Sequence, residues 1–269
     1  VGAGNMTKIH VHTNEPWNVI KYCLTYGDLH EVKVENMKEQ NLRLQASKPL
    51  KDLAVVAVSA GEGLNEIFQG LGADFVVTGG QTMNPSTEDF LAAIEKVHAK
   101  EVILLPDNKN IILTAEQAAK ISENTKVFVV PSRSIPQGIT SMMSYNVELS
   151  GEENAENMTA ALANVRSIEI THAVRDTSIE DKEIKEGQIL GIVDGKIKAV
   201  GDEMTNLVED TLKSMDIDDY ELVTVYYGAD VSAEEAEKLL DDLSEKYPEI
   251  EFELHEGGQA VYYYLLSAE

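Results

Sequence analysis

The feature that most constrains the fold is a continuous apolar run at Leu53–Val58, which carries no polar side chain at alternate positions. A strand with one wet face alternates apolar and polar residues, whereas a strand inside a parallel sheet is buried on both faces. Similar runs follow at Phe75–Val77, Glu101–Leu105 and Val127–Val130, with helical patterns between them. Strand and helix therefore alternate, which predicts an α/β fold with a doubly wound parallel sheet.

The pattern changes after Tyr145, where helices mix with antiparallel pairs. Asp194-Gly195 is the turn of a hairpin between two apolar stretches, and Ser232 with Glu235 forms a capping box at a helix start. We expect a parallel α/β subdomain over residues 46–150 and a mixed α+β subdomain over residues 151–269.

Residues 1–45 read as a short strand–helix–strand piece, with strands at Lys8–Thr13 and Leu29–Val34 around a helix at Trp17–Tyr26. The piece is too short for a core of its own, so we expect it to be the end of another domain. Cys23 lies within the predicted helix and is expected to be a core residue.

His10 and His12 would share one face of the first predicted strand, because side chains two residues apart point the same way. Zinc accepts imidazoles at this spacing when further ligands come from elsewhere. The same pair also fits two polar side chains on a half-exposed strand.

The chain is strongly acidic, with 22 Lys and Arg against 47 Asp and Glu and a formal net charge of -25. Such a surface repels nucleic acid and anionic membranes, and it suits either a basic partner protein or plain solvation. A single cysteine, Cys23, excludes an internal disulfide and suits a reducing cytoplasm. No apolar run approaches the roughly 20 residues of a membrane span. Because the sequence begins with Val1 and not Met, we expect a piece of a longer protein.

Candidate binding residues follow the predicted strand ends, where open α/β sheets bind ligands. The loop Thr78–Ser86 offers glycines for close backbone approach and a helix start with free N–H groups. The loops Ser59–Gly63, Asp107–Asn110 and Ser132–Gly138 should share this edge, and the turn His255–Gln259 should face them. The candidate cleft residues are Thr78, Gly79, Gly80, Gln81, Thr82, Asn84, Ser86, Arg133, Gln137, His255, Gly257 and Gly258. These loops also fit ordinary strand-to-helix turns or a surface for another protein.

Several segments together resemble the C-terminal part of a bacterial fatty acid kinase family, the FakA proteins, which are related to dihydroxyacetone kinases. They are Lys8–Thr13 with Pro16, Thr78–Ser86, Leu105–Ile111, Arg133–Gly138 and Glu256–Gln259. The resemblance implies a DegV-like fold for the C-terminal domain and an ATP- and magnesium-binding domain elsewhere in the intact protein. It also implies a middle domain in which a Cys and two His form a metal-linked site. His10 and His12 match those histidines, and the Cys would lie upstream of Val1, so zinc is expected only with that Cys.

The sequence departs from the DegV fatty-acid site at several positions. Thr82-Met83-Asn84-Pro85-Ser86 aligns with a Thr-Ser-Gln-Pro-Ser loop, with Met83 in place of a serine. The His-Thr-Gly-Pro-Gly turn of that family becomes His255–Gln259, and no Arg occurs near Val200–Asp202. A carboxylate needs a positive charge or several donors. The fold is therefore expected to be kept and the lipid function to be weakened or replaced.

The sequence thus predicts a non-catalytic C-terminal module of a fatty acid kinase that docks an acyl-carrying, DegV-type fatty-acid-binding protein. The alternative is a DegV-type protein that itself binds a lipid or small molecule. A free-standing enzyme is disfavoured, because the sequence has no phosphate loop, dinucleotide fingerprint or nucleophile elbow. We expect no cofactor in this chain, and ATP, magnesium and zinc in the intact protein; a homodimer stays open. The loops Thr78–Ser86, Arg133–Gly138 and His255–Gln259 are expected to meet at one narrow cleft whose rim contacts the partner.

Overall fold

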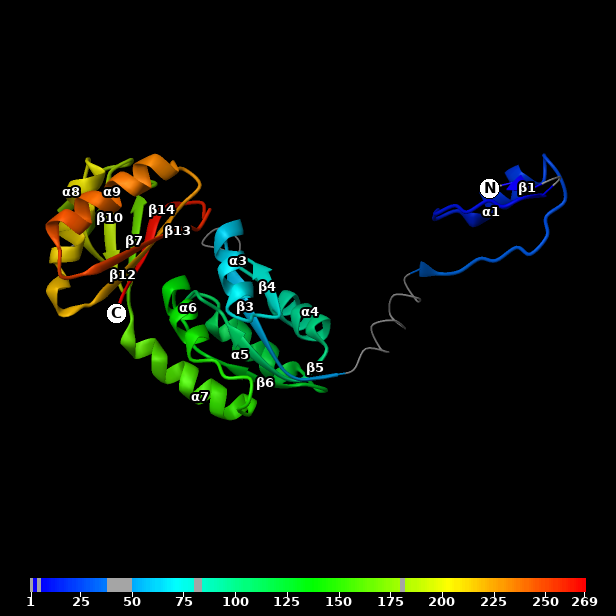
Figure 1. Cartoon of the computed structure of the whole chain (residues 1–269), viewed down its shortest axis with the longest axis horizontal. Coiled ribbons are helices and arrows are strands. Elements are labelled where there is room, and N and C mark those ends of the chain that lie inside the picture. Colours follow the sequence, from blue (N-terminus) through cyan, green and yellow to red (C-terminus); the bar gives the residue numbers. More distant parts are fainter. Residues whose placement is uncertain (1, 4–5, 38–49, 80–83, 180–181) are drawn as a thin grey trace. The chain divides into compact units, whose positions relative to one another are not determined.

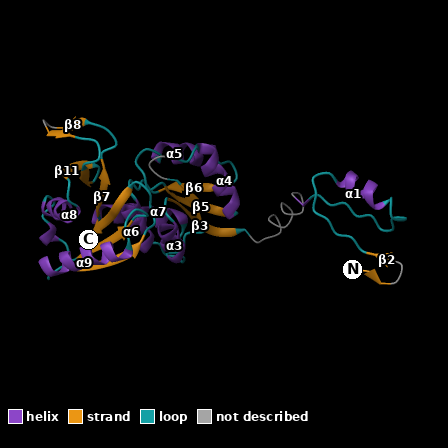
Figure 2. Cartoon of the chain, turned by 90° about the horizontal axis from the view of Figure 1, so that it is seen from above, coloured by secondary structure: helices purple, strands orange, loops and turns teal. Residues whose placement is uncertain are grey.

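The structure, a computed structural model, describes residues 2–3, 6–37, 50–79, 84–179 and 182–269. The chain divides into two compact units, residues 1–49 and 50–269. Figure 1 shows both units, and Figure 2 shows their helices and strands from a second direction. Within the described ranges, no helix combines the length and apolar composition needed to cross a membrane.

The first unit has little regular structure. Strand β1 (Gly2–Ala3) pairs antiparallel with β2 (Met6–Thr7), and helix α1 (Pro16–Cys23) follows. The predicted strands at Lys8–Thr13 and Leu29–Val34 are wrong, because both segments have irregular backbone. An alternating pattern makes a strand only where a neighbour completes the hydrogen-bond ladder, and the described part of this unit offers none to either segment.

Helix α1 buries none of its side chains within the described part of the unit. Trp17 and Tyr22 are both more than half exposed. Cys23 is only partly buried, so the expectation of a core cysteine is wrong in this structure.

The second unit begins with a four-stranded parallel sheet in the order β4-β3-β5-β6. Its elements are β3 (Lys51–Ser59), α3 (Glu62–Gly70), β4 (Phe75–Thr78), α4 (Thr87–Val97), β5 (Ala99–Leu105), α5 (Ile112–Ile121), β6 (Lys126–Val129), α6 (Ile135–Met143) and α7 (Gly151–Ala161). Ala54, Val56 and Val58 pack with α4 and α5, whereas Val55 and Ala57 pack with α3, α6 and α7. Helices cover both faces, which confirms the predicted doubly wound sheet.

A six-stranded mixed sheet follows, in the order β11-β10-β7-β14-β12-β13, with only β12 and β13 parallel. Its elements are β7 (Arg166–His172), β8 (Thr177–Ile179), β9 (Lys182–Ile184), β10 (Ile189–Val193), β11 (Lys196–Gly201), α8 (Met204–Lys213), β12 (Leu222–Tyr227), α9 (Ala233–Lys246), β13 (Glu251–Glu256) and β14 (Tyr262–Ala268), with short 3-10 turns at Leu162–Asn164 and Ile217–Asp219. Strands β8 and β9 form a separate hairpin. Helices α8 and α9 pack on one face, and Tyr226 and Leu265 on the other face join the core beneath α3 and α6.

Local signals explain most helix boundaries. Ser86 and Ser232 begin α4 and α9 with complete capping boxes, as predicted. Helix α5 begins at Ile112, so the predicted Thr114 cap is wrong. Helix α6 was not predicted, because Pro136 and Gly138 resemble a loop in sequence. Proline is tolerated in a first helical turn, where its missing N–H costs nothing.

The two sheets of the second unit are joined where α3 begins. The Leu64 amide donates a hydrogen bond to the Gly257 carbonyl oxygen at 3.1 Å. A Cβ at Gly63 would overlap the Glu256 carbonyl, and one at Gly61 would overlap that of Gly257. Gly61 also has a φ of 134°, which L side chains rarely adopt. Glycines therefore let the start of α3 lie against the segment after β13.

Substituting Gly63→Ala should push these segments apart and destabilise the second unit by about 1–3 kcal/mol, the usual effect of overpacking. The matched control is Gly70→Ala at the other end of α3, where an added Cβ would meet nothing within 4 Å. Urea unfolding monitored by circular dichroism measures both variants. A Gly63→Ala variant as stable as Gly70→Ala would contradict this description of the joint.

Candidate functional site

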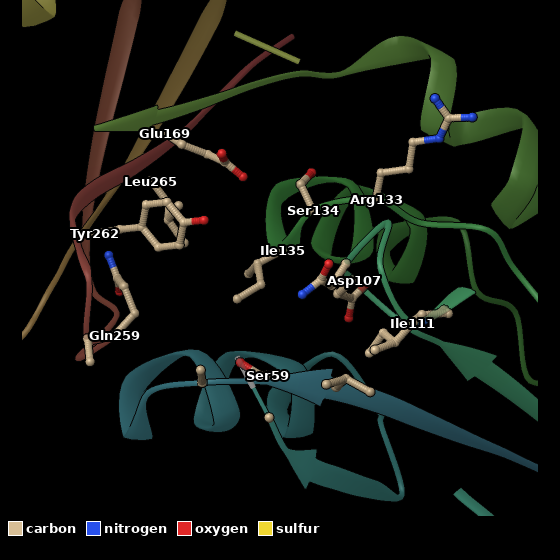
Figure 3. Close-up of a pocket in the computed structure, with 16 residues that line it drawn as sticks. Ser59, Asp107, Ile111, Arg133, Ser134, Ile135, Glu169, Gln259, Tyr262 and Leu265 are labelled. Atoms are coloured by element: carbon tan, nitrogen blue, oxygen red, sulfur yellow. The ribbon is translucent and has the colours of Figure 1, made fainter. Parts of the chain in front are cut away.

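A cavity lies within the second unit, at the carboxyl ends of β3 and β5 (Figure 3). Its walls come from both sheets and from the start of α6. The lining residues are Val58, Ser59, Ala60, Gly79, Pro106, Asp107, Asn108, Ile111, Arg133, Ser134, Ile135, Glu169, Gln259, Ala260, Tyr262 and Leu265. Its volume of about 50 Å³ has room for a few water molecules.

Asp107 is the most perturbed acid in the cavity wall. It follows β5 with a φ of 54°, and only 6% of its surface is exposed. Its backbone amide donates to Ser132 Oγ at 3.0 Å, and its carboxyl lies against Gly138 in the first turn of α6, where any Cβ would clash. Burial raises the pKa of the Asp107 carboxyl well above its ordinary value, partly offset by Ser132 and the backbone of Val58.

The position of this carboxyl decides what the helix start can bind. The first N–H groups of a helix form a natural anion site. At α6 that place is taken by the chain's own Asp107 carboxyl. A carboxylate ligand would therefore meet an acid where the fold would otherwise offer it donors.

Glu169 supplies a second acid from β7, and Figure 3 shows its carboxyl directed toward the open centre of the cavity. Burial raises its pKa, the charge of Lys109 offsets part of that effect, and Asp194 adds to it. Two acids thus line one small cavity.

The start of α6 is held by a serine pair. Ser134 Oγ accepts from the Gln137 amide at 3.3 Å and lies 2.5 Å from Ser167 Oγ on β7. Gln137 Oε1 accepts from the Arg133 amide at 2.8 Å. These contacts fix the helix start against the mixed sheet.

The structure brings some candidate residues together and leaves others apart. Gly79 and Arg133 line the cavity, joined by Gln259 from the predicted turn. Asn84 accepts from Asn108 in the cavity wall at 3.4 Å. Gly80, Gln81 and Thr82 lie outside the described residues, as does Met83.

The remaining candidates have other places. Thr78 pairs with Ser59 in the sheet, and Ser86 caps α4. Gly257 and Gly258 pack on the start of α3 and do not line the cavity. His255 is exposed on β13, where it stacks on Tyr226. The proposed cleft residues therefore stay a prediction as a set.

Sequence reasoning missed Glu169, Tyr262 and Leu265. Glu169 lies between two isoleucines of β7, so alternation alone places it on the face opposite a buried one. A second packed sheet covers that face, and the sequence pattern did not reveal that packing.

The candidate metal residues lie in the first unit. His10 Nε2 and His12 Nε2 are 3.2 Å apart, and both side chains are exposed. Two nitrogens bound to one tetrahedral zinc at about 2.0–2.1 Å would be separated by about 3.3 Å. The pair therefore fits as two ligands of a site. Among the described residues no cluster of three or more His, Cys, Asp and Glu is arranged to hold a metal.

Comparison with protein families decides the family. The family model of the FakA-like fatty acid kinase C-terminal domain matches residues 54–269, and that of the FakA-like middle domain matches residues 1–44. The chain belongs to the FakA-like fatty acid kinase family. This confirms the resemblance predicted from the motifs. Protein YloV of Bacillus subtilis is 42% identical over 275 residues, which cover 98% of this chain and 50% of YloV. The chain thus spans about half the length of the curated relatives it matches.

Solved structures confirm the fold class. A DegV family protein of Corynebacterium glutamicum, Cg2579, is similar with a TM-score of 0.60 and 16% identity, covering 81% of this chain and 97% of that one. The linoleic-acid-loaded fatty acid kinase B3 protein of Streptococcus pneumoniae has a TM-score of 0.51 and 11% identity over 81% of this chain and 99% of its own. The dihydroxyacetone kinase of C. freundii has a TM-score of 0.51 and 14% identity over 98% of this chain and 57% of its own. At these identities the likeness shows the fold alone.

The stability of this family member should depend on the protonation of Asp107. Because its folded-state pKa is raised, the stabilisation linked to its proton is complete below the unfolded-state pKa. It is lost as pH rises toward the folded-state value. Between pH 4 and 8, the unfolding free energy of the wild type should fall relative to Asp107→Asn by about 1 kcal/mol or more, the equivalent of one pKa unit.

Urea unfolding at several pH values measures this difference. Asp52→Asn serves as the control, since Lys100 lowers the pKa of exposed Asp52 and the sign of the change is reversed. A pH-independent difference between wild type and Asp107→Asn would contradict the raised pKa.

The chain should bind zinc weakly, because two protein ligands are too few for a closed site. Metal content after dialysis against a mild chelator, measured by atomic emission, should be far below one zinc per chain. A stoichiometric content that His10→Ala abolishes, and that the exposed-histidine control His30→Ala keeps, would show the expectation to be wrong.

Proposed function

We propose that this chain is a non-catalytic module of a fatty acid kinase that docks an acyl-carrying, DegV-type protein for phosphorylation by an ATP-binding domain outside this chain. Family membership supports the kinase context. The sequence has no GxxxxGK[ST] loop that would cradle ATP phosphates. ATP and magnesium therefore belong, in this proposal, to that other domain, and zinc to a site completed by an upstream Cys.

The observation that carries the proposal is the Asp107 carboxyl at the first turn of α6. In a fold shared with a protein loaded with linoleic acid, this acid and Glu169 disfavour a fatty-acid carboxylate in the cleft. A volume of about 50 Å³ also suits a few waters and not a long acyl chain. The module keeps the DegV-type architecture and leaves the acyl chain to a separate protein.

The rim of the cleft is the proposed docking surface. Arg133, His255 and Glu256 are exposed around it, and the chain as a whole carries a net charge of -25. A partner with a basic contact surface would be drawn to this rim, and the attraction would weaken with salt.

Isothermal titration of the chain with a DegV-type protein loaded with oleate tests docking. We expect a complex whose affinity falls between 50 and 300 mM salt. Glu256→Lys on the rim should weaken it roughly three- to tenfold. The control Glu245→Lys, on exposed α9, makes the same charge change away from the cleft. No complex at low salt, or equal effects of the two variants, would contradict rim docking.

The alternative is a DegV-type carrier of a lipid or small molecule, which the shared fold favours. Native mass spectrometry of the purified chain distinguishes the two functions. A docking module should have the mass of the bare polypeptide, whereas a carrier should retain an acyl ligand.

A further inference from the structure

Three buried side chains around the cavity have oxygens without a hydrogen-bond partner. They are Ser59 Oγ, both carboxyl oxygens of Asp107, and Gln259 Oε1, and the statement holds for the residues that the structure describes. Ser59 is 1% exposed and Gln259 is 2% exposed, so solvent does not satisfy them from outside. Unpartnered buried oxygens are uncommon, because each costs about 1–3 kcal/mol of desolvation.

These oxygens surround one opening and come from different elements. Figure 3 shows Ser59 at the end of β3, Asp107 on the side of α6, and Gln259 beside β14. The Gln259 amide nitrogen donates to the Tyr226 carbonyl oxygen at 2.9 Å, which fixes the side chain and sends its other atom elsewhere. Ser132 and the backbone of Val58 lie near the Asp107 carboxyl, yet neither makes a hydrogen bond of normal geometry to it.

The rest of the wall is mainly apolar, with Val58, Ile111, Ile135 and Leu265 between the polar groups. Apolar walls with a few placed polar groups are typical of sites for small organic molecules. A bare metal ion is disfavoured, because no three His, Cys, Asp or Glu groups converge in the described parts of the chain. A carboxylate is disfavoured by Asp107 and Glu169.

We propose that this cavity is a binding site for a small aliphatic molecule that presents hydrogen-bond donors, as hydroxyl or ammonium groups, to Ser59, Asp107 and Gln259. The donors would satisfy the buried oxygens, and the short carbon frame would contact the apolar wall. The cavity volume of about 50 Å³ limits the ligand to a few heavy atoms. This site goes beyond docking, and it does not depend on any partner protein.

Saturation-transfer NMR on the 269-residue chain tests the site with four probes of similar size. Propane-1,2-diol and ethanolamine present donors, whereas acetate and acetone present acceptors only. We expect transfer to at least one donor probe and to neither acceptor probe. The diol and ethanolamine arms also show whether a neutral hydroxyl or a cationic ammonium is preferred.

Asp107→Asn replaces an acceptor oxygen with an NH₂ group and should weaken the bound donor probe about tenfold or more, the usual effect of losing a hydrogen bond to a charged group. Asp52→Asn makes the same charge change at a side chain that is 89% exposed, and binding should be unchanged. Ser59→Ala is a second test that keeps the proposal falsifiable if Asp107→Asn does not fold. It removes an unpartnered hydroxyl and should weaken the probe without loss of stability.

Three results would overturn the proposal. One is no saturation transfer to either donor probe at tens of millimolar. Another is transfer to acetate or acetone of the same strength as to the donors. The third is equal donor binding by wild type, Asp107→Asn and Ser59→Ala. None of these results bears on docking, because the titration with the acyl-carrying protein measures a separate event.

Discussion

The arrangement of the second unit depends on the contact between the start of α3 and the segment after β13. The Leu64–Gly257 hydrogen bond and the close approach of Gly61 and Gly63 to carbonyl groups join the two sheets at one edge. Tyr226 and Leu265 extend the same joint into the core beneath α3 and α6. Because this joint is made of backbone and apolar packing, it fixes the distance between the sheets whatever polar residues line the cavity beside it.

On this fixed frame a few polar residues decide the chemistry. The start of α6 would suit an anion, but Gly138 leaves space that the Asp107 carboxyl fills. Glu169 adds a second acid from the opposite sheet. The polarity of the cleft is therefore opposite to that of a carboxylate site, although the helices and strands that build it have a DegV-like arrangement.

The sequence predicts the parts of this fold that local patterns determine. The apolar run at Leu53–Val58, the Asp194-Gly195 turn and the Ser232 capping box all appear in the structure where they were expected. Helix α6 was missed because the reason for Gly138 is a contact with Asp107, a residue distant in the chain. The strand predicted over Lys8–Thr13 failed because a strand depends on its neighbour. The site was predicted only in part, since Glu169 becomes a wall residue through packing between sheets.

The two units differ in what holds their side chains in place, and this difference bears on their chemistry. In the second unit, the three cavity side chains with unpartnered oxygens are fixed by packing on every side. In the first unit, α1 buries none of its side chains, and His10 and His12 are exposed. A metal site needs rigid ligands as well as enough of them, because freely rotating side chains lose entropy on binding. Both requirements point to further packing and a further ligand for the histidine pair, whereas the cavity already has a rigid wall.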